Sequence, residues 1–102
     1  MRLLTQALLN RFAQVGPQDD AHNPVIVAKF FNPQGSGTWY AASFDPESGL
    51  FFGYVSIFGD HNDEWGYFSL SELESYRGPL GLGIERDRYW QEKRASEAIG
   101  EV

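Results

Sequence analysis

The sequence predicts one α+β domain, built on an antiparallel meander sheet of four to five strands with two short helices packed mainly on one face. Three observations support this fold class. The chain has 102 residues, which fits a single domain. Four segments rich in β-branched and aromatic residues are separated by short turns. Two further segments, one before the strands and one after them, have helical spacing and capping residues.

The first helix is predicted over residues 6–13. Thr5 can act as its N-cap by accepting a hydrogen bond from the first turn, and Leu8 and Phe12 then share one face. Gly16 and the proline after it end the helix, because glycine accepts a left-handed backbone and proline cannot continue the helical hydrogen bonds.

Four strands follow, separated by short polar connections. The turn at 45–49 combines Asp, Pro and Gly, which is typical of a tight reversal. Connections this short favour antiparallel pairing between neighbours and therefore predict a meander. Gly53 inside the third strand indicates a bulge or a large side chain lying across the backbone. The strands are predicted over residues 25–31, 38–44, 50–58 and 65–68.

A second helix is predicted over residues 70–77. Ser69 and Glu72 have the spacing of a capping box, and Leu73 completes a hydrophobic contact with the residue before the cap. The Gly-Pro pair at 78–79 ends this helix, for the same reason as in the first one.

The end of the chain has two parts. Residues 84–90 contain a run of alternating charges, which is typical of a protected sheet edge, and are predicted as an edge strand or a loop that completes a domain over residues 1–90. Residues 91–102 carry mixed charges and small side chains, which predicts a flexible or loosely helical tail.

Composition narrows the functional classes. The chain has no cysteine, which excludes disulfides, thiolate chemistry and cysteine-based zinc sites, and agrees with a reducing, cytoplasmic location. The formal net charge is −6 with eight Lys and Arg residues, which disfavours direct nucleic-acid binding and favours a basic partner. No segment approaches the length of a membrane span, so no membrane contact is predicted.

Three motifs are better explained by structure than by chemistry. The glycine-rich run at 78–83 follows a helix, whereas a phosphate-binding loop follows a strand and opens a helix. Residues 60–64 offer carboxylates and His61, but the rest of a calcium loop is missing, so 59–64 is predicted as a solvated hairpin loop. The other histidine, His22, lies in a polar connector. We therefore predict no metal site and no cofactor, and identify no catalytic residue.

Aromatic side chains carry the strongest functional signal. They make up 16% of the chain, and an aromatic core accounts for many of them. Consecutive strand residues such as Trp39 and Tyr40 must point to opposite faces, while two short helices cover only one face. Some rings are therefore expected to remain partly exposed and to form an interaction site. The candidate rings are Trp39, Tyr40, Tyr54, Trp65 and Tyr67.

Residues 85–88 form the densest alternation of charge. On a strand, Glu85 and Asp87 would face one side and Arg86 and Arg88 the other. One interpretation is a solvated edge with weak ion pairs. The other is a fork of arginines that grips carboxylates or phosphates of a partner, which makes these four residues candidate binding residues.

Six motifs occur in a fixed order over roughly residues 3–90, namely Leu3-Leu4-Thr5, Ala28-Lys29-Phe30-Phe31, Thr38-Trp39-Tyr40-Ala41, Phe52-Gly53-Tyr54-Val55, Gly66-Tyr67-Phe68-Ser69-Leu70 with Glu72-Leu73, and Gly78-Pro79-Leu80-Gly81-Leu82 with Ile84-Glu85-Arg86-Asp87. With them the chain resembles a family of short bacterial proteins known as a domain of unknown function. Its members often lie on plasmids and integrative elements. No catalytic residues are assigned to this family, so the resemblance transfers none to the chain. The chain departs from the family at Ser43, where members often have an acidic residue, and at Gly83, where proline is common.

The expected function is that of a non-catalytic module, which binds another protein through its exposed aromatic residues and residues 85–88. The resemblance implies mobile genetic elements as its setting. Two alternatives remain open. One is a small enzyme that uses Glu85 or Asp87 together with Arg86. The other is an acidic mimic of DNA, which requires carboxylates in regular rows. The oligomeric state does not follow from the sequence.

Overall fold

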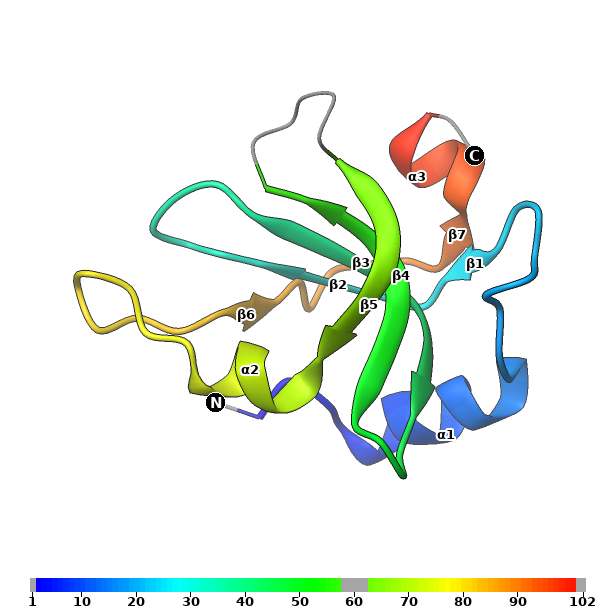
Figure 1. Cartoon of the computed structure of the whole chain (residues 1–102), viewed down its shortest axis with the longest axis horizontal. Coiled ribbons are helices and arrows are strands. Elements are labelled where there is room, and N and C mark those ends of the chain that lie inside the picture. The colour runs from blue at the N-terminus through cyan, green and yellow to red at the C-terminus, as the bar shows by residue number, and fades with distance from the viewer. Residues whose placement is uncertain (1, 58–62, 101–102) are drawn as a thin grey trace.

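The computed structural model of the chain describes residues 2–57 and 63–100. Its centre is one antiparallel sheet of five strands: β2 (Ala28–Phe31), β3 (Thr38–Asp45), β4 (Leu50–Ser56), β5 (Glu64–Ser69) and β6 (Glu85–Arg86). The spatial order is β5-β4-β3-β2-β6, so four consecutive strands form a meander and β6 joins the edge of β2 (Figure 1). The predicted α+β fold class is confirmed.

Two helices, α1 (Gln6–Val15) and α2 (Leu70–Ser75), pack on the same face of this sheet. The side chain of Thr5 caps α1 by accepting a hydrogen bond from the backbone N–H of Leu8 at 3.1 Å. Ser69 caps α2 in the same way. Both predicted caps are confirmed, although α1 ends two residues later than predicted and α2 ends two residues earlier.

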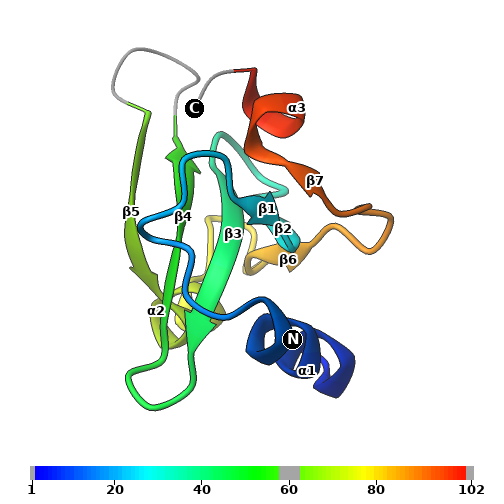
Figure 2. The same cartoon turned by 90° about the vertical axis from the view of Figure 1, so that its right-hand side faces the viewer.

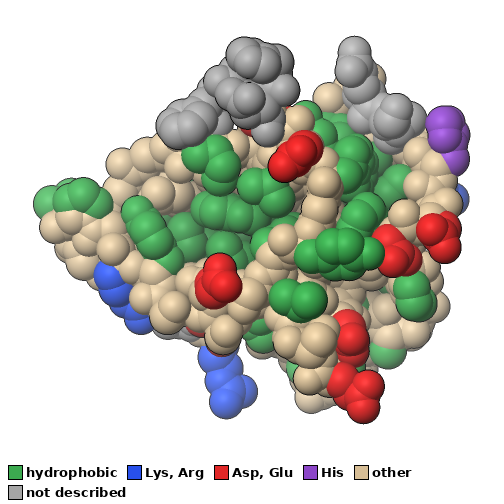
Figure 3. Space-filling view, viewed as in Figure 1, with side chains coloured by type: hydrophobic (Ala, Val, Ile, Leu, Met, Phe, Trp, Pro, Cys, Tyr) green, Lys and Arg blue, Asp and Glu red, His purple; other side chains and the backbone are tan. Residues whose placement is uncertain are grey.

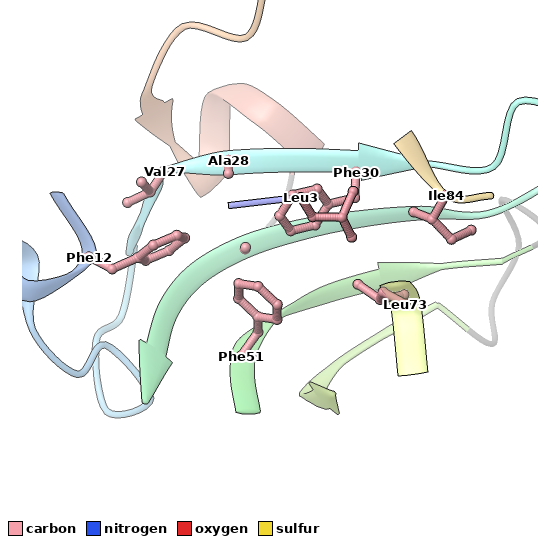
Figure 4. Close-up of a cluster of buried hydrophobic side chains, with 9 residues drawn as sticks. Leu3, Phe12, Val27, Ala28, Phe30, Phe51, Leu73 and Ile84 are labelled. Carbon is pink, nitrogen blue, oxygen red and sulfur yellow. The ribbon is translucent and has the colours of Figure 1, made fainter. Parts of the chain in front are cut away.

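The main core lies between this face of the sheet and the two helices. Phe51 of β4 is fully buried at its centre, and its ring contacts those of Phe30, Phe44 and Phe68 at centroid distances of 5.4, 4.7 and 5.1 Å. Phe12 from α1 and Leu73 from α2 point into the same cluster (Figure 4). The other buried members are Leu3, Val27, Ala28, Ala41 and Ile84.

The strand predicted over residues 25–31 is split into two. Its first part, β1 (Val25–Ile26), pairs instead with β7 (Lys93–Arg94) near the end of the chain. Directly after β7 comes a third helix, α3 (Ala95–Ile99), whose first backbone N–H donates to the carbonyl of Pro24 at 2.8 Å. Figure 2 shows α3 beside β1 and β7, with α1 at the other end of the molecule.

The segment that we expected to be a flexible or loosely helical tail is therefore helical in part, but it is docked on the domain. Ala95 is fully buried, together with Ile26 and Ala42, in a second, smaller core. The physical reason is that the small and apolar residues of α3 complete a hydrophobic contact on the face of the sheet opposite α1 and α2.

A bulge in β3 lies beside the glycine that suggested one. The register between β3 and β4 shifts between Ala41 and Ser43, so Ala42 is the extra residue and Gly53 stands opposite Ala41. The side-chain nitrogen of Gln18 donates to the carbonyl of Ala42 at 2.6 Å, which satisfies a backbone group that the bulge removes from the ladder.

The polar loop predicted over residues 59–64 falls mainly on residues 58–62, which lie outside the described part of the chain. Within residues 2–57 and 63–100, no helix combines the length and the apolar character needed to cross a lipid bilayer.

Candidate functional site

The sheet gathers aromatic side chains in two rows on the face opposite α1 and α2. Residues aligned across neighbouring strands share a face, and the register aligns Tyr40 with Tyr54 and Tyr54 with Trp65. Phe52 and Tyr67 form the second row, two residues further along the same strands. Together with one ring from the segment after β6, they form what we call the aromatic face: Tyr40, Phe52, Tyr54, Trp65, Tyr67 and Trp90.

The rings of the aromatic face touch one another without a break. Their centroid separations lie in the range of favourable ring pairs, so each ring limits the rotation of its neighbours and the surface is preorganised. The successive pairs are Trp90–Tyr40 at 6.0 Å, Tyr40–Tyr54 at 6.3 Å, Tyr54–Trp65 at 5.5 Å, Trp65–Phe52 at 5.6 Å and Phe52–Tyr67 at 5.3 Å.

Solvent reaches this surface only in part. Besides α1 and α2 on the opposite face, the third helix α3 packs on this side of the sheet, and the second core lies under Tyr40, Phe52 and Trp65. The indole N–H of Trp90 also donates to the carbonyl of Ile26 at 3.0 Å, which holds that ring in place. The rings are half-buried except Tyr67, which is 61% exposed. The aromatic face is thus a partly open surface.

The two ends of the aromatic face differ in charge. At one end, the ammonium group of Lys93 lies 4.5 Å from the centroid of the Trp90 ring, and that of Lys29 lies 5.7 Å from the same ring. At the other end, the hydroxyl of Tyr67 donates to a carboxylate oxygen of Asp19 at 2.8 Å. A cationic end and an anionic end give the surface a direction, which constrains how a partner can lie on it.

Two tyrosines of the aromatic face have hydroxyl groups with a raised pKa. The hydrogen bond to Asp19, followed by burial and then by the nearby charges of Asp19 and Asp20, raises the pKa of Tyr67 above its ordinary value. Burial, followed by the negative charge of Asp63, raises the pKa of Tyr40. Both side chains therefore act as neutral hydrogen-bonding groups over the physiological range.

Trp39 lies apart from the other candidate rings. It precedes Tyr40 on β3 and points to the opposite face, where it packs against the main core. There it lines a cavity of about 370 Å³ with Phe68, Tyr76 and others. Figure 3 looks onto this hollow, where hydrophobic side chains gather between α2, β5 and the β2–β3 turn.

The charged segment at 85–88 is partly an edge strand. Glu85 and Arg86 form β6, whereas Asp87 and Arg88 leave the strand and enter a turn. The Nη1 atom of Arg86 donates to the backbone carbonyl of Leu3 at 3.0 Å, so this guanidinium holds the N-terminal segment. Asp87 accepts from the backbone N–H of Tyr89. Arg86 and Arg88 are therefore not equivalent arms of a fork, because the guanidinium of Arg86 is engaged in a hydrogen bond within the fold.

A larger cavity adjoins the aromatic face. It has a volume of about 500 Å³, and Phe52 and Tyr67 line it together with Asp19 and Ser43. Sequence reasoning identified Tyr67 but missed Phe52, Asp19 and Ser43 in this cavity, and Trp90 on the aromatic face. The two-residue period from Tyr54 could have identified Phe52, but Trp90 reaches the face only through tertiary packing.

A metal centre has no support in the part of the chain that the structure describes. Among residues 2–57 and 63–100, no group of three or more His, Cys, Asp or Glu side chains is placed to hold a metal ion.

Comparison with known proteins gives a family. No curated protein and no solved structure matches the chain. One family model, described as a protein of unknown function (DUF2958), matches residues 2–98, which is nearly the whole sequence. The chain, with its five-stranded sheet and docked C-terminal segment, therefore belongs to the DUF2958 family.

Proposed function

We propose that this protein is a non-catalytic binding module whose aromatic face receives another protein. The observation that supports the proposal most strongly is the unbroken series of six half-buried or exposed rings on one face of the sheet. Partly buried aromatic side chains fixed by their neighbours are typical of the centre of protein interfaces, where they bury much area at little cost in side-chain entropy.

The partner that fits this surface has apolar side chains at its centre and complementary charges at its ends. A carboxylate of the partner would meet Lys29 and Lys93 at the Trp90 end. A basic group would meet Asp19 at the Tyr67 end. The net charge of −6 adds long-range attraction for a basic protein and speeds its encounter with the surface.

An enzyme that uses residues 85–88 has weaker support. Arg86 is engaged by the backbone of Leu3, and the cavity next to Arg86 and Asp87 has a volume of only about 150 Å³. Cavities that enclose small-molecule ligands are commonly at least twice that size.

A DNA mimic also has weaker support than a protein-binding module. Such a mimic needs carboxylates in regular rows, whereas Lys29 and Lys93 lie on the aromatic face itself. Figure 3 shows basic as well as acidic side chains on the side of the molecule that it presents.

We place this module in the bacterial cytoplasm, as an accessory protein of mobile genetic elements. The absence of cysteine fits a reducing compartment. The mobile-element setting is suggested by the resemblance of the ordered motifs to proteins that are carried by plasmids and integrative elements.

A site-specific crosslinking experiment tests the proposal. A photoreactive phenylalanine analogue is introduced at Tyr67, which is 61% exposed on the aromatic face, or at Leu80, which is 80% exposed in the loop after α2. Both proteins are expressed in the native host and irradiated. We expect a defined protein adduct from position 67 and none from position 80, although position 80 is the more exposed.

Substitution gives the matching binding measurement. Tyr67→Ser should weaken retention of the crosslinked partner at least about tenfold, because tyrosines that become buried against a partner are among the residues that commonly dominate affinity. Leu80→Ser should leave retention unchanged. Equal adducts from both positions, or equal loss for both variants, would show that the aromatic face is not the binding site.

A further inference from the structure

The large cavity beside the aromatic face lies where three segments meet. It is bounded by the end of α1 with the residues that follow it, by the hairpin of β3 and β4, and by β5. Because Phe52 and Tyr67 belong both to its wall and to the aromatic face, a partner lying on the rings would also cover the cavity mouth. Its volume of about 500 Å³ is within the range of ligand-sized sites.

The wall of the cavity combines apolar and acidic side chains. Phe12, Phe44 and Phe52 supply rings to its wall. Asp19 and Asp45 are also among its lining residues, whereas none of the Lys and Arg side chains in the described part of the chain lines it. We call this site the acidic pocket.

The charge of Asp19 is not neutralised within the described part of the chain. In residues 2–57 and 63–100 the one ion pair joins Arg11 to Glu92 on another part of the surface. One oxygen of Asp19 accepts from Tyr67, which leaves the second oxygen able to accept. Asp45 differs, because its two oxygens hold the β3–β4 turn through the backbone of Glu47 and the hydroxyl of Ser48.

A buried hydroxyl points to a polar ligand group. Ser43, the residue after the bulge, is only 8% exposed and lies in the pocket wall. Its Oγ has no hydrogen-bond partner among the described residues. Every fully buried polar side-chain atom in that part of the chain has a hydrogen-bond partner, so the Oγ of Ser43 keeps some contact with open space. Because Ser43 lines the cavity, we infer that its hydroxyl reaches that space.

We propose that the acidic pocket receives a lysine or arginine side chain of the protein bound on the aromatic face. The apolar stem of that side chain lies along Phe12, Phe44 and Phe52, and its cationic end donates to Asp19 and to Ser43 Oγ. Rings in the wall add attraction for the cation through their π faces. This inference rests on the proposed function and specifies the partner chemistry at that site.

The raised pKa of Tyr67 is consistent with this electrostatic picture, because the charges of Asp19 and Asp20 contribute to it. Local negative potential of this kind disfavours a phenolate and favours a bound cation.

The experiment is a titration of the isotope-labelled protein followed by backbone amide NMR shifts. The probes are lysine and arginine with both backbone ends blocked, and blocked norleucine is the control, since it has a similar stem without the charge. We expect saturable shifts at Asp19, Ser43 and Phe44 for the cationic probes, with a dissociation constant on the order of 1–10 mM. Norleucine should bind at least about tenfold more weakly.

Matched variants locate the cation. Asp19→Asn keeps an oxygen that can accept from Tyr67, so the fold is preserved, and it should weaken lysine binding about tenfold. Asp20→Asn removes the same charge from the neighbouring residue, which does not line the pocket, and should change binding less than twofold. Ser43→Ala should weaken binding by a smaller factor than Asp19→Asn.

Two results would overturn the inference. One is equal affinity for lysine and norleucine, or no saturable shift for either. The other is an equal effect of Asp19→Asn and Asp20→Asn. Because the titration needs no partner protein, it can fail while crosslinking at position 67 succeeds, and that combination would reject the pocket inference alone.

Discussion

The close packing of β3 against β4 predicts that a single methyl group at position 53 disrupts the sheet. Gly53 lies in the middle of β4, between Phe52 and Tyr54 of the aromatic face. A Cβ atom built there overlaps the carbonyl oxygen of Tyr40 and lies 2.9 Å from its carbonyl carbon and 3.1 Å from Cα of Ala41. All these atoms belong to the backbone, so a side-chain rotation cannot relieve the overlap.

The expected cost of Gly53→Ala follows from that geometry. Ordinary carbon contacts begin near 3.4 Å, so β3 and β4 must separate by several tenths of an ångström or more. Overpacking that moves side chains costs about 1–3 kcal/mol, and here backbone at the centre of the sheet must move. We therefore expect Gly53→Ala to lower the free energy of unfolding by at least about 3 kcal/mol. That is a large part of the total of about 5–15 kcal/mol for a domain.

Gly66 provides the matched control. It pairs directly with Gly53 across β4 and β5, and a Cβ atom built on it has no neighbour within 4 Å. Gly66→Ala should leave stability unchanged or raise it by about 0.5 kcal/mol, because alanine reduces the entropy of the unfolded chain.

Urea unfolding followed by tryptophan fluorescence and circular dichroism measures both variants. Three tryptophans report on the transition. A loss of about 3 kcal/mol corresponds to a fall in melting temperature of more than about 10 °C for a domain of this size. If Gly53→Ala stays within about 1 kcal/mol of the wild type, or if Gly66→Ala is equally destabilised, the steric reasoning is wrong.

Two other predictions concern the Tyr67 end of the aromatic face and the docking of α3. Because the pKa of Tyr67 is raised, the folded state holds this phenol proton more tightly than the unfolded state, so its stabilising contribution is complete below about pH 10 and is lost as the pH rises through the folded pKa. Ultraviolet titration of phenolate should show Tyr67 ionising later in the wild type than in Asp19→Asn; an unchanged titration would contradict the role of the hydrogen bond. Ala95→Asp places a carboxylate in the second core and should cost about 2 kcal/mol or more and release α3 to proteolysis, whereas the exposed Glu97→Ala should change neither.

Local signals in the sequence predicted much of this fold. The caps at Thr5 and Ser69 depend on residues within one helical turn, so their spacing alone identifies where α1 and α2 begin. The strands of the meander are joined by short turns, and their β-branched and aromatic residues are adjacent in the chain. The side chains of Trp39 and Tyr40 point to opposite faces because successive residues of a strand alternate between its two faces, which is also a local property.

The departures from prediction involve contacts between distant residues. β1 does not belong to the main sheet because Val25 pairs with Arg94 and Ile26 pairs with Lys93. These partners are separated by about seventy positions along the chain. Residues 91–102 resemble a tail in sequence because their few apolar side chains form no long pattern, whereas in the fold Ala95, Ala98 and Ile99 pack in the second core and dock α3. From the sequence, Arg86 is a candidate for binding a partner, whereas in the structure its guanidinium donates to the backbone of the N-terminal segment.

The candidate site likewise has features that depend on local sequence and features that depend on contacts between distant residues. Alternation along strands and short turns determined, from the sequence by itself, that tyrosines and tryptophans would lie on both faces of an antiparallel sheet. Only the tertiary structure decided which of these rings remain partly exposed and which charges lie at each end of the aromatic face. It also decided that a buried serine and acidic side chains line one cavity. The reason is physical: helix and strand periods act over a few residues, whereas burial and electrostatic surroundings are set by whichever distant segments pack against them.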